Sequence, residues 1–410
     1  MVKTILIMSC LLLILVLTVN TDIEAASSAK TVGLGDEFVT VIGADALYGN
    51  PGAVNVTSDR FTFEFGMAGS LWNNLLVNDY IDEEMKDELL ADVEDGFLGG
   101  GESNNGLKAI LGPVAISAEG RGAALFDLSY DVAELLLKGN EIDKAYDLSG
   151  SIGSGAVYGD LGVNFSISPE KLKEKLDLKD LRVGLTYHQL SGAIFSLEGS
   201  GRTIITYDQD GDPVVRGDGY FVAKYNEPDG INDGSATGSA FDFGIYADLN
   251  DKYSLGFSVM NLGALRVNGI HELRYEYNEE SEEFEEVEEV GDSDIVKDEE
   301  LEYKLPAVIR FGGKMNWSKN IDLFADYSYT SYNDGQKDHK FATATEITWL
   351  KSLPLRTGIS YSTLEKDLDW SAGMGLDLWI FEADLGISDL MGLFNDSKEV
   401  EGALNLKIEF

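Results

Sequence analysis

The last eight residues, Ala403–Phe410, alternate strictly between apolar and polar side chains. Successive side chains of an extended strand point to opposite sides, so this stretch predicts a strand with one apolar face and one wet face. The strand ends on an aromatic residue, Phe410. Such a strand fits either the wall of a membrane barrel or the last strand of a soluble β-sandwich, and the preceding sequence has to decide between them.

The same alternation recurs through the closing third of the chain, which holds seven candidate strands: Leu305–Trp317, Asn320–Ser331, Lys340–Leu350, Leu353–Thr363, Asp369–Leu378, Trp379–Ser388 and Gly402–Phe410. In two of these strands, acids and glycines share one face. Carboxylates are poor residues for a soluble core, but they suit a lumen that is lined by water or filled by a plug. We therefore expect four acids to face a lumen: Asp369, Asp377, Glu382 and Asp384.

Aromatic residues gather near the ends of these strands, as the interface girdle of a membrane barrel requires: Trp317, Tyr327, Tyr329, Tyr332, Trp349, Tyr361, Trp370 and Trp379. Some of them could equally be ordinary cross-strand packing. Together with the strand candidates between about 178 and 277, the pattern predicts an all-β fold. Its form would be a transmembrane antiparallel β-barrel of about 14 strands, and at most about 16.

The amino terminus has the features of a secretory signal. Lys3 precedes the apolar run Ile5–Val19, and small residues follow near Ala25. We expect residues 1–25 to be a cleaved signal peptide and residues 26–410 to form a single barrel domain. Cys10, the one cysteine, lies within the signal, so the mature chain would hold no disulfide. No other apolar run is long enough for a spanning helix, so a membrane location requires a closed barrel.

The formal net charge of −41 argues against nucleic acid as a partner. Much of the acidic excess lies in residues 278–302, where glutamate dominates. A segment of this composition cannot bury itself, so it predicts a solvated, mobile outer loop.

Three stretches in the first half show helical rather than strand spacing: residues 79–96, 131–138 and 169–176. Their apolar faces are narrow, so each helix should pack on protein. They would cap or plug one end of the barrel, or else lie outside it as loop helices. Between the first two, Gly99-Gly100-Gly101 has no phosphate-loop context and predicts a flexible joint.

The mature amino terminus, residues 26–56, contains the turn Asn50-Pro51-Gly52. Pro51 fixes its own φ angle and Gly52 tolerates a positive one, so the three residues predict a tight turn.

Three sequence stretches resemble one family. Gly43–Val54 (GADALYGNPGAV) is similar to the A-x-x-x-x-N-P-A entry motif of the long-chain fatty-acid transporter (FadL)-like superfamily. Leu255–Gly263 resembles its S-x-x-N-L-G strand, and Leu305–Trp317 its L-P-x-x-x-R-x-G strand. Gly52 stands where the family usually has alanine. The helical segments resemble an uncharacterised branch that is similar to PorV and TraF.

This resemblance implies a 14-stranded barrel with residues 26–56 inside or under it as a gate or plug, with Asn50, Pro51 and Gly52 as the entry motif. The terminal Phe410 resembles the assembly signal that the barrel assembly machinery reads in bacterial outer-membrane barrels. Location in the outer membrane and contact with its lipid would follow from the resemblance. A substrate would not, because members of the superfamily differ between uptake of hydrophobic molecules and service to secretion systems.

Candidate chemistry is sparse. Asp208, Asp210 and Asp212 could converge on a hard cation, but no glutamate follows at EF-hand distance, and Asp-Gly is a common hairpin turn. His188, His271 and His339 are scattered, and Ser191 is too close to His188 on one strand to form a nucleophile–base pair. We therefore expect no enzyme, no cofactor and no established metal site.

Three functions remain open from the sequence. The barrel could pass or hand over a small solute, including a hydrophobic one. It could instead dock or shuttle secreted or surface proteins without a solute path. The third alternative is a soluble secreted β-protein.

Overall fold

The computed structural model describes the part of the chain beyond the expected signal, with several gaps: residues 28–35, 38–56, 61–75, 83–93, 96–139, 141–207, 213–226, 228, 234–278, 283–286, 295–332, 335–390 and 399–410. The expected signal peptide, residues 1–25, lies outside the described residues.

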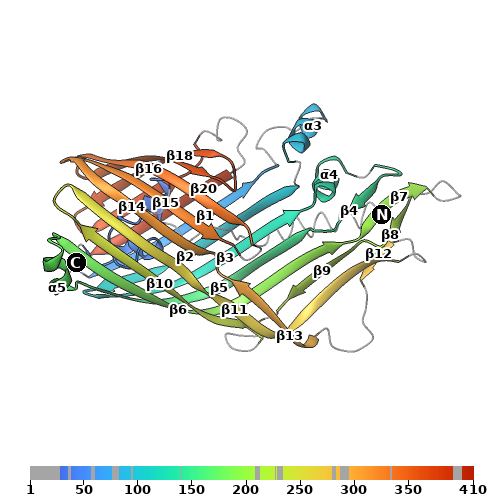
Figure 1. Cartoon of the computed structure of the whole chain (residues 1–410), viewed down its shortest axis with the longest axis horizontal. Helices are drawn as coiled ribbons and strands as arrows, with labels where there is room; N and C mark the ends of the chain where they lie inside the picture. The colour runs from blue at the N-terminus through green and yellow to red at the C-terminus, as the bar shows by residue number, and fades with distance from the viewer. Residues whose placement is uncertain are drawn as a thin grey trace.

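The wall of the molecule is a closed antiparallel barrel of 14 strands, which confirms the expected fold class (Figure 1). Each strand pairs with its neighbours in the barrel, and the first strand pairs with the last, which closes the ring. The barrel strands are β1 (Thr62–Asn73), β2 (Phe97–Leu111), β3 (Val114–Leu128), β5 (Ile152–Ile167), β6 (Asp180–Ser200), β10 (Ala236–Asp248), β11 (Tyr253–Asn278), β14 (Ala307–Ser318), β15 (Ile321–Ser331), β16 (Lys337–Leu350), β17 (Leu353–Ser362), β18 (Leu368–Leu378), β19 (Phe381–Ile387) and β20 (Glu399–Glu409).

The two ends of the barrel differ. At one end, here called the turn end, most strands are joined by short hairpins such as 112–113, 319–320 and 379–380. At the other, the loop end, the connections are longer and carry additional elements. The carboxyl terminus lies at the turn end (Figure 1). Membrane barrels of bacteria have this asymmetry, with short turns on the periplasmic side.

The wall continues past the ring at the loop end. Strands β9 (Tyr220–Tyr225), β12 (Glu283–Glu286) and β13 (Ile295–Lys304) extend the main sheet. A separate three-stranded sheet is formed by β4 (Ala145–Asp147), β7 (Arg202–Tyr207) and β8 (Pro213–Gly217). The expectation of a loop throughout 278–302 was therefore wrong, because β13 pairs with β11 over Ala264–His271 and its acids lie on a hydrogen-bonded ladder.

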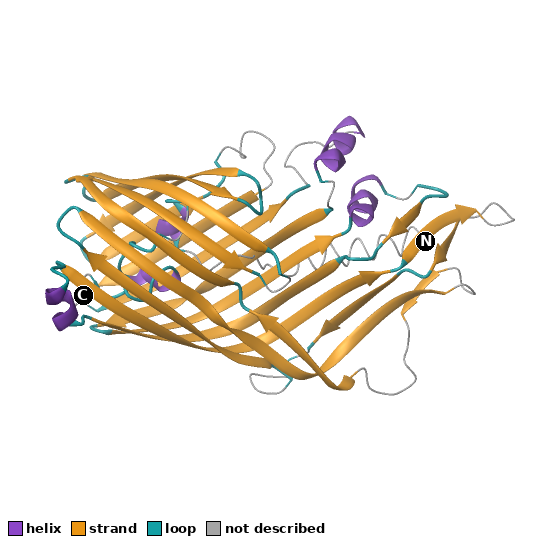
Figure 2. Cartoon of the chain, viewed as in Figure 1, coloured by secondary structure: helices purple, strands orange, loops and turns teal. Residues whose placement is uncertain are grey.

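The three expected helical stretches contain α3 (Glu83–Asp92), α4 (Tyr130–Lys138) and α5 (Glu170–Lys175). Helices α3 and α4 pack on each other at the loop end through Leu89, Leu90 and Ala133, and α5 lies at the turn end (Figure 1). They sit on the ends of the wall rather than within the lumen. Two other short helices, α2 (Ala29–Val32) and η1 (Ala44–Tyr48), lie inside the barrel (Figure 2). None of the helices in the described ranges has the length and apolar character needed to cross a membrane.

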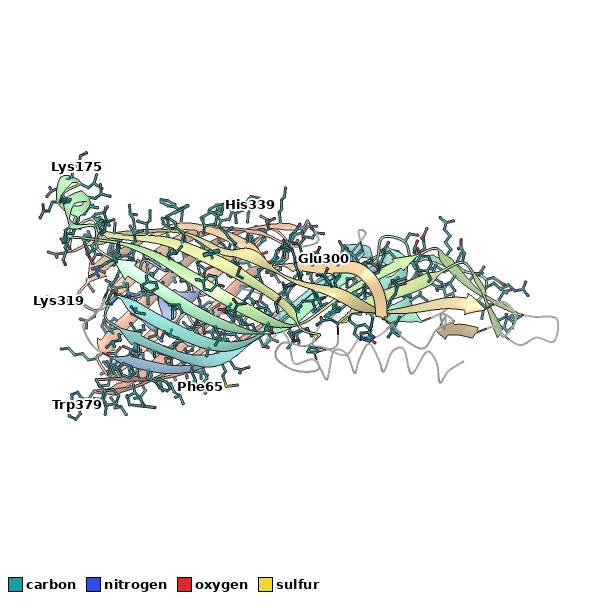
Figure 3. All side chains as sticks on the ribbon, turned by 90° about the horizontal axis from the view of Figure 1, so that it is seen from below. Phe65, Lys175, Glu300, Lys319, His339 and Trp379 are labelled. Atoms are coloured by element: carbon teal, nitrogen blue, oxygen red, sulfur yellow. The ribbon has the colours of Figure 1, made fainter. Side chains whose placement is uncertain are left out.

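The outward face of the ring is apolar. In β1 the burial alternates residue by residue, with Phe63 and Phe65 exposed and Glu64 buried. The same parity exposes Leu161 and Phe165 on β5. Near the turn-end hairpins, Trp317, Trp349 and Trp379 are exposed by 63%, 70% and 92%; Figure 3 shows Trp379 at the edge of the wall. A soluble β-sandwich would bury such residues against a second sheet, whereas here they cover the outside of the ring.

Two local expectations were wrong. Gly99-Gly100-Gly101 is not a joint but part of β2, where Gly100 is paired with Trp72 of β1. Glycine weakens a strand in general, yet Gly99 has a packing reason here, because an added Cβ would lie 2.7 Å from the ring of Phe97. Tyr332 was expected in an outer girdle, but it is buried among the apolar residues inside the loop end.

Candidate functional site: the barrel interior

A segment from the mature amino terminus occupies the lumen. We call residues 28–35 and 38–56 the inner segment. All of its described residues are buried or half-buried, although they form only the short helices α2 and η1 and connecting turns. Part of its backbone is hydrogen-bonded within the segment, as between Gly43 and Ala53, and part is hydrogen-bonded to side chains of the barrel wall.

Inward-facing glycines let this backbone approach the wall. A Cβ atom added to Gly358 would lie 1.6 Å from the carbonyl oxygen of Leu34, and one added to Gly184 would lie 2.1 Å from that of Pro51. Gly386 stands in the same relation to Ala29, at 2.3 Å. The glycines on the polar face of the strands therefore act as contact points for the inner segment, because any side chain there would collide with its backbone.

Asn50 anchors the entry motif to the wall. It is fully buried, and its Nδ2 donates hydrogen bonds to the carbonyl oxygens of Val39 and Ile245 at 2.7 and 2.9 Å. Its Oδ1 accepts from the N–H of Gly52 at 3.0 Å, which closes the expected turn. The amide of Asn50 thus holds the turn together and also fastens it to β10.

The carbonyl oxygens of this turn and of the preceding Gly49 accept hydrogen bonds from two further strands. Asn164 of β5 donates to the oxygen of Pro51 at 3.3 Å, and Ser166 donates to that of Gly52 at 3.1 Å. Ser258 of β11 donates to the oxygen of Gly49 at 2.6 Å. Residues from β5, β10 and β11, all distant from the turn in sequence, therefore converge on it.

The beginning of the inner segment is fixed on the opposite side of the ring. The N–H of Ala29 donates to Asn405 Oδ1 of β20, and the N–H of Val39 donates to Asp326 Oδ2 of β15, both at 2.7 Å. Lys30 pairs with Glu346 at 3.4 Å. The segment thus spans the lumen and is attached on several sides.

Charged pairs line the wall around the inner segment. Lys108 and Glu64 are in contact at 2.8 Å, and both side chains are 1% exposed. The Lys108 ammonium also lies 3.7 Å from the ring centroid of Tyr48 in the inner segment. Buried charges of this kind are tolerated only when they are paired, so the pairs hold the wall and inner segment in one arrangement.

The four acids that were expected to face the lumen are now placed. Asp384 contacts Arg356, and Glu382 pairs with Lys407 at 2.7 Å. Asp369 is buried on the inward face of β18. Asp377 has the same parity but lies near the turn-end hairpin, where it is exposed.

A histidine cluster that sequence reasoning missed lies across three strands. His188 on β6 contacts Asp160 of β5 through Nδ1 at 2.9 Å and Asp242 of β10 through Nε2 at 2.8 Å. Arg121 of β3 joins Asp160, at 3.1 Å, to Glu119, at 2.8 Å. Ser191 is three residues from His188 and therefore lies on the other face of the strand. The sequence signal for this cluster is that each of its residues falls at an inward-facing position of its strand. That signal does not identify the partners, because they are distant in sequence.

Towards the loop end the interior becomes apolar. Large side chains meet across the lumen there, in what we call the mouth cluster; its buried members include Trp72, Leu125, Ile194, Leu265, Val267 and Tyr332. The interior is therefore divided by level, with an apolar mouth and a charged middle that holds the inner segment.

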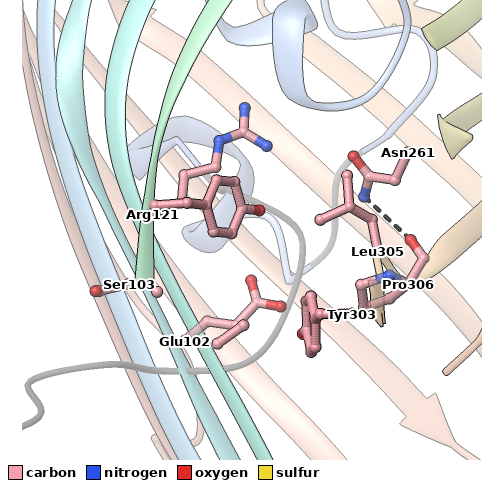
Figure 4. Close-up of a pocket in the computed structure, with 10 residues that line it drawn as sticks. Glu102, Ser103, Arg121, Asn261, Tyr303, Leu305 and Pro306 are labelled. Carbon is pink, nitrogen blue, oxygen red and sulfur yellow. Dashed lines mark hydrogen bonds between the residues drawn. The ribbon is translucent and has the colours of Figure 1, made fainter. Parts of the chain in front are cut away.

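A small cavity lies where these two levels meet (Figure 4). Its lining includes Glu102, Arg121, Tyr158, Asn261, Tyr303 and Leu305. Tyr158, Tyr303 and Leu305 also belong to the mouth cluster, so the cavity continues it. Asn261 has a positive φ of 61°, and its N–H donates to Asp242 at 2.6 Å. It stands at a break in the β10–β11 register, where the hydrogen-bonded ladder is locally interrupted.

Two further expected sites are the aspartates of 208–212 and the terminal Phe410. Asp208, Asp210 and Asp212 lie outside the described residues. Phe410 is at the turn end, where its ring stacks on Phe61 with a centroid distance of 6.4 Å. Within the described ranges, no group of three or more His, Cys, Asp or Glu side chains is arranged to hold a metal ion.

Comparison with solved structures finds the same architecture in hydrophobic-solute channels. A Pseudomonas aeruginosa FadL homologue superposes with a TM-score of 0.56 at 10% identity, covering 95% of this chain and 99% of that one. The Pseudomonas putida toluene transporter TodX gives 0.54 at 12% identity, with 92% and 98% covered. The Ralstonia pickettii toluene transporter TbuX gives 0.51 at 11%, with 94% and 97% covered. At these identities the likeness shows the fold.

A search of curated protein sequences gives no match. A protein-family model does match residues 52–381, which is most of the chain, and that family is described as one of unknown function, DUF5723. The chain therefore belongs to the DUF5723 family, and it has the fold of the FadL-like barrels.

Proposed function

We propose that this chain is an outer-membrane barrel that passes a small hydrophobic solute from the outside towards the periplasm. The expected signal peptide would direct it across the inner membrane, and the apolar outward face would contact outer-membrane lipid. The turn end would face the periplasm and the loop end the exterior.

The observation that carries the proposal is the mouth cluster. The mouth cluster places apolar side chains in the lumen next to a level that is lined by charged residues. Barrel stability alone does not explain this arrangement, since the outer face already contacts lipid. A hydrophobic solute that entered this apolar zone would gain about 25 cal/mol per Å² of apolar surface buried. The fold shared with the toluene transporters TodX and TbuX supports the same conclusion.

The inner segment would act as the gate of this path. It occupies the lumen between the cavity and the turn end, and the Asn50-Pro51-Gly52 turn is its most firmly held part. A solute would leave towards the periplasm only when part of the segment shifts. We also place the chain in the PorV-like and TraF-like branch of the superfamily, on its helical segments and motifs.

Uptake of radiolabelled toluene tests the proposal. Cells that display the assembled barrel should take up toluene faster than matched cells without it, at equal amounts of heat-modifiable protein in the outer membrane. Equal uptake by the two strains would contradict the proposal.

A second function is favoured by a different observation. The inner segment fills the lumen and is tied to β5, β10, β11, β15 and β20, as a barrel without a solute path would require. Such a barrel would dock or shuttle a secreted or surface protein. In planar bilayers this alternative predicts no conductance from the parent protein, and none after deletion of the strands that extend the wall at the loop end, β9, β12 and β13.

A further inference from the structure

Helix α5, which joins β5 to β6 at the turn end, presents apolar side chains to its surroundings. None of its residues is buried. Leu172 is 46% exposed, and Leu176, which caps the helix, is 54% exposed. The two leucines are four residues apart, so they lie on one face of the helix. This face packs only partly on the rest of the protein.

The charged residues of α5 are arranged around its apolar face. Successive residues of a helix are about 100° apart, so Lys171 and Lys175 flank the leucines on one side. Glu170 and Glu174 lie on the opposite face, and Glu170 is paired with Lys173. A helix that lies in a membrane interface has this arrangement, with apolar residues towards the acyl chains and lysines reaching the headgroups.

The apolar face of α5 continues the outward face of the wall. Strand β5 leads into the helix, and its last outward residues, Phe165 and Ile167, are exposed as the leucines are. In Figures 1 and 3 the helix stands at the edge of the turn end, where Lys175 is labelled in Figure 3. Because the outward face of an outer-membrane barrel contacts lipid, lipid is the medium that adjoins this helix.

Two hairpins elsewhere at the turn end have the same chemistry. Trp317 and Trp349 are exposed, and each is followed two residues later by an exposed lysine, Lys319 or Lys351. Tryptophan and lysine are the residues that hold a membrane protein at the level of the headgroups. These hairpins therefore mark the headgroup level at the end of the barrel that carries α5.

Lysines are concentrated at α5 although the chain is strongly acidic. Four of the nine residues 171–179 are lysine, whereas acids outnumber bases by 72 to 31 in the whole chain. Lys179 is paired with Asp251 at 2.6 Å. Lys171 and Lys175 have no ion-pair partner within the described ranges, so they remain for an external anion. Exposed Glu174 on the opposite face keeps the expected attraction modest.

We propose that α5 lies in the headgroup layer of the lipid leaflet at the turn end. Leu172 and Leu176 contact the upper part of the acyl chains, and Lys171 and Lys175 contact lipid phosphates, with a preference for an anionic headgroup. This inference rests on the membrane location that the proposed function assumes, and it does not depend on the passage of a solute.

Lipid-dependent quenching in the reconstituted full-length barrel tests the inference. Because the expected mature chain lacks cysteine, a fluorophore can be attached at Leu172→Cys, Leu176→Cys or, as the matched control on the opposite face, Glu174→Cys. The first two labels should be quenched by phosphatidylcholine with a nitroxide near the headgroup end of its acyl chain. The third should be quenched by aqueous iodide.

The role of the lysines is measured with the Leu172 label. Nitroxide phosphatidylglycerol should quench it at least about threefold more effectively than nitroxide phosphatidylcholine at equal mole fraction and low salt. The double variant Lys171→Gln/Lys175→Gln should lower this ratio to about one. Lys171→Arg/Lys175→Arg keeps both charges and should keep the ratio. Heat-modifiable migration on gels checks that each variant is assembled.

The outcomes separate this inference from the membrane orientation on which it rests. Iodide quenching at positions 172 and 176 as strong as at 174 overturns the inference, and so does shielding from both quenchers, which indicates contact with a second copy. A ratio near one in the parent, or one that the glutamine variant leaves unaltered, overturns the phosphate contact. A label at Leu161→Cys on β5 should be quenched by a nitroxide deep in the bilayer, and failure there contradicts the barrel orientation as well.

Discussion

Gly358 shows how single residues position the inner segment. Replacing it with alanine would place a methyl group 1.6 Å from the carbonyl oxygen of Leu34, so the inner segment or the strand must shift. Overpacking of this kind costs about 1–3 kcal/mol. We expect Gly358→Ala to assemble, to lower the free energy of unfolding by that amount and to raise ion conductance in planar bilayers.

Gly402 provides the matched control. It also lies on a barrel strand, but an added Cβ there would meet no atom within 4 Å. Gly402→Ala should therefore behave as the parent does. If the two alanine variants are indistinguishable in stability and conductance, the inner segment does not depend on contact with Gly358.

Lys108 is the residue whose loss should be most costly among the charged pairs. Lys108→Met would leave the Glu64 carboxylate buried without its cation, at a cost of about 3–5 kcal/mol. Adding Glu64→Gln removes that charge, and Asn405 can still donate to the remaining oxygen. Denaturant unfolding in phospholipid should show a large loss in the single variant and recovery in the double variant. A double variant that is no more stable than the single one would refute this explanation.

At the level of elements, the closing strand β20 completes the ring by pairing with β1. The N–H of Phe410 donates to the carbonyl oxygen of Phe61 at 3.0 Å, and the two rings stack. We expect deletion of Phe410 to reduce assembly in the outer membrane while secretion across the inner membrane continues. Fractionation after a pulse label measures both steps, and normal assembly of the truncated chain would count against an assembly signal.

Phe61→Ala separates the two roles of this terminus. It removes the stacking partner and keeps the terminal residue that the barrel assembly machinery would read. If Phe61→Ala impairs assembly as strongly as the deletion does, packing at the β1–β20 seam rather than recognition is responsible.

The sequence predicted some elements better than others, for physical reasons. The strands from β14 to β20 alternate large apolar and polar residues, so their period is visible without a structure. Strands β2, β3 and β5 are rich in glycine, alanine and serine, which obscures the period because small residues suit both faces. Tyr253–Asn278 is one long strand that changes partners from β14 to β13 near Asn261, and such an exchange of partners leaves no mark in the sequence.

The interior was predictable only in part. Parity alone pointed to Glu382 and Asp384 on the inward face, and both are in charged pairs there. Parity could not identify their partners, because Arg356 and Lys407 come from other strands. Which residues lie at the same height along the barrel axis depends on how the ring closes. The His188 cluster was missed for the same reason, since Asp160 and Asp242 lie on separate strands on either side of it.

On the scale of the whole molecule, the barrel has three levels along its axis. A turn end carries exposed tryptophans, a charged middle encloses the inner segment, and an apolar mouth lies near the loop end. The formal charge of −41 is compatible with this arrangement, because the outward face of the ring is apolar and buried acids such as Glu64 and Asp384 are paired with cations.

The most direct test of the account asks which side of the wall contacts lipid. The mature chain would contain no cysteine, so single spin labels can be placed along β5 from Val157 to Phe165 in the reconstituted protein. Labels at Val157, Leu161 and Phe165 should be accessible to oxygen dissolved in lipid, and labels at Tyr158, Asp160 and Asn164 should be shielded from it. The absence of this alternation, or exposure of the first set to a water-soluble relaxant, would contradict the barrel orientation and the proposed function with it.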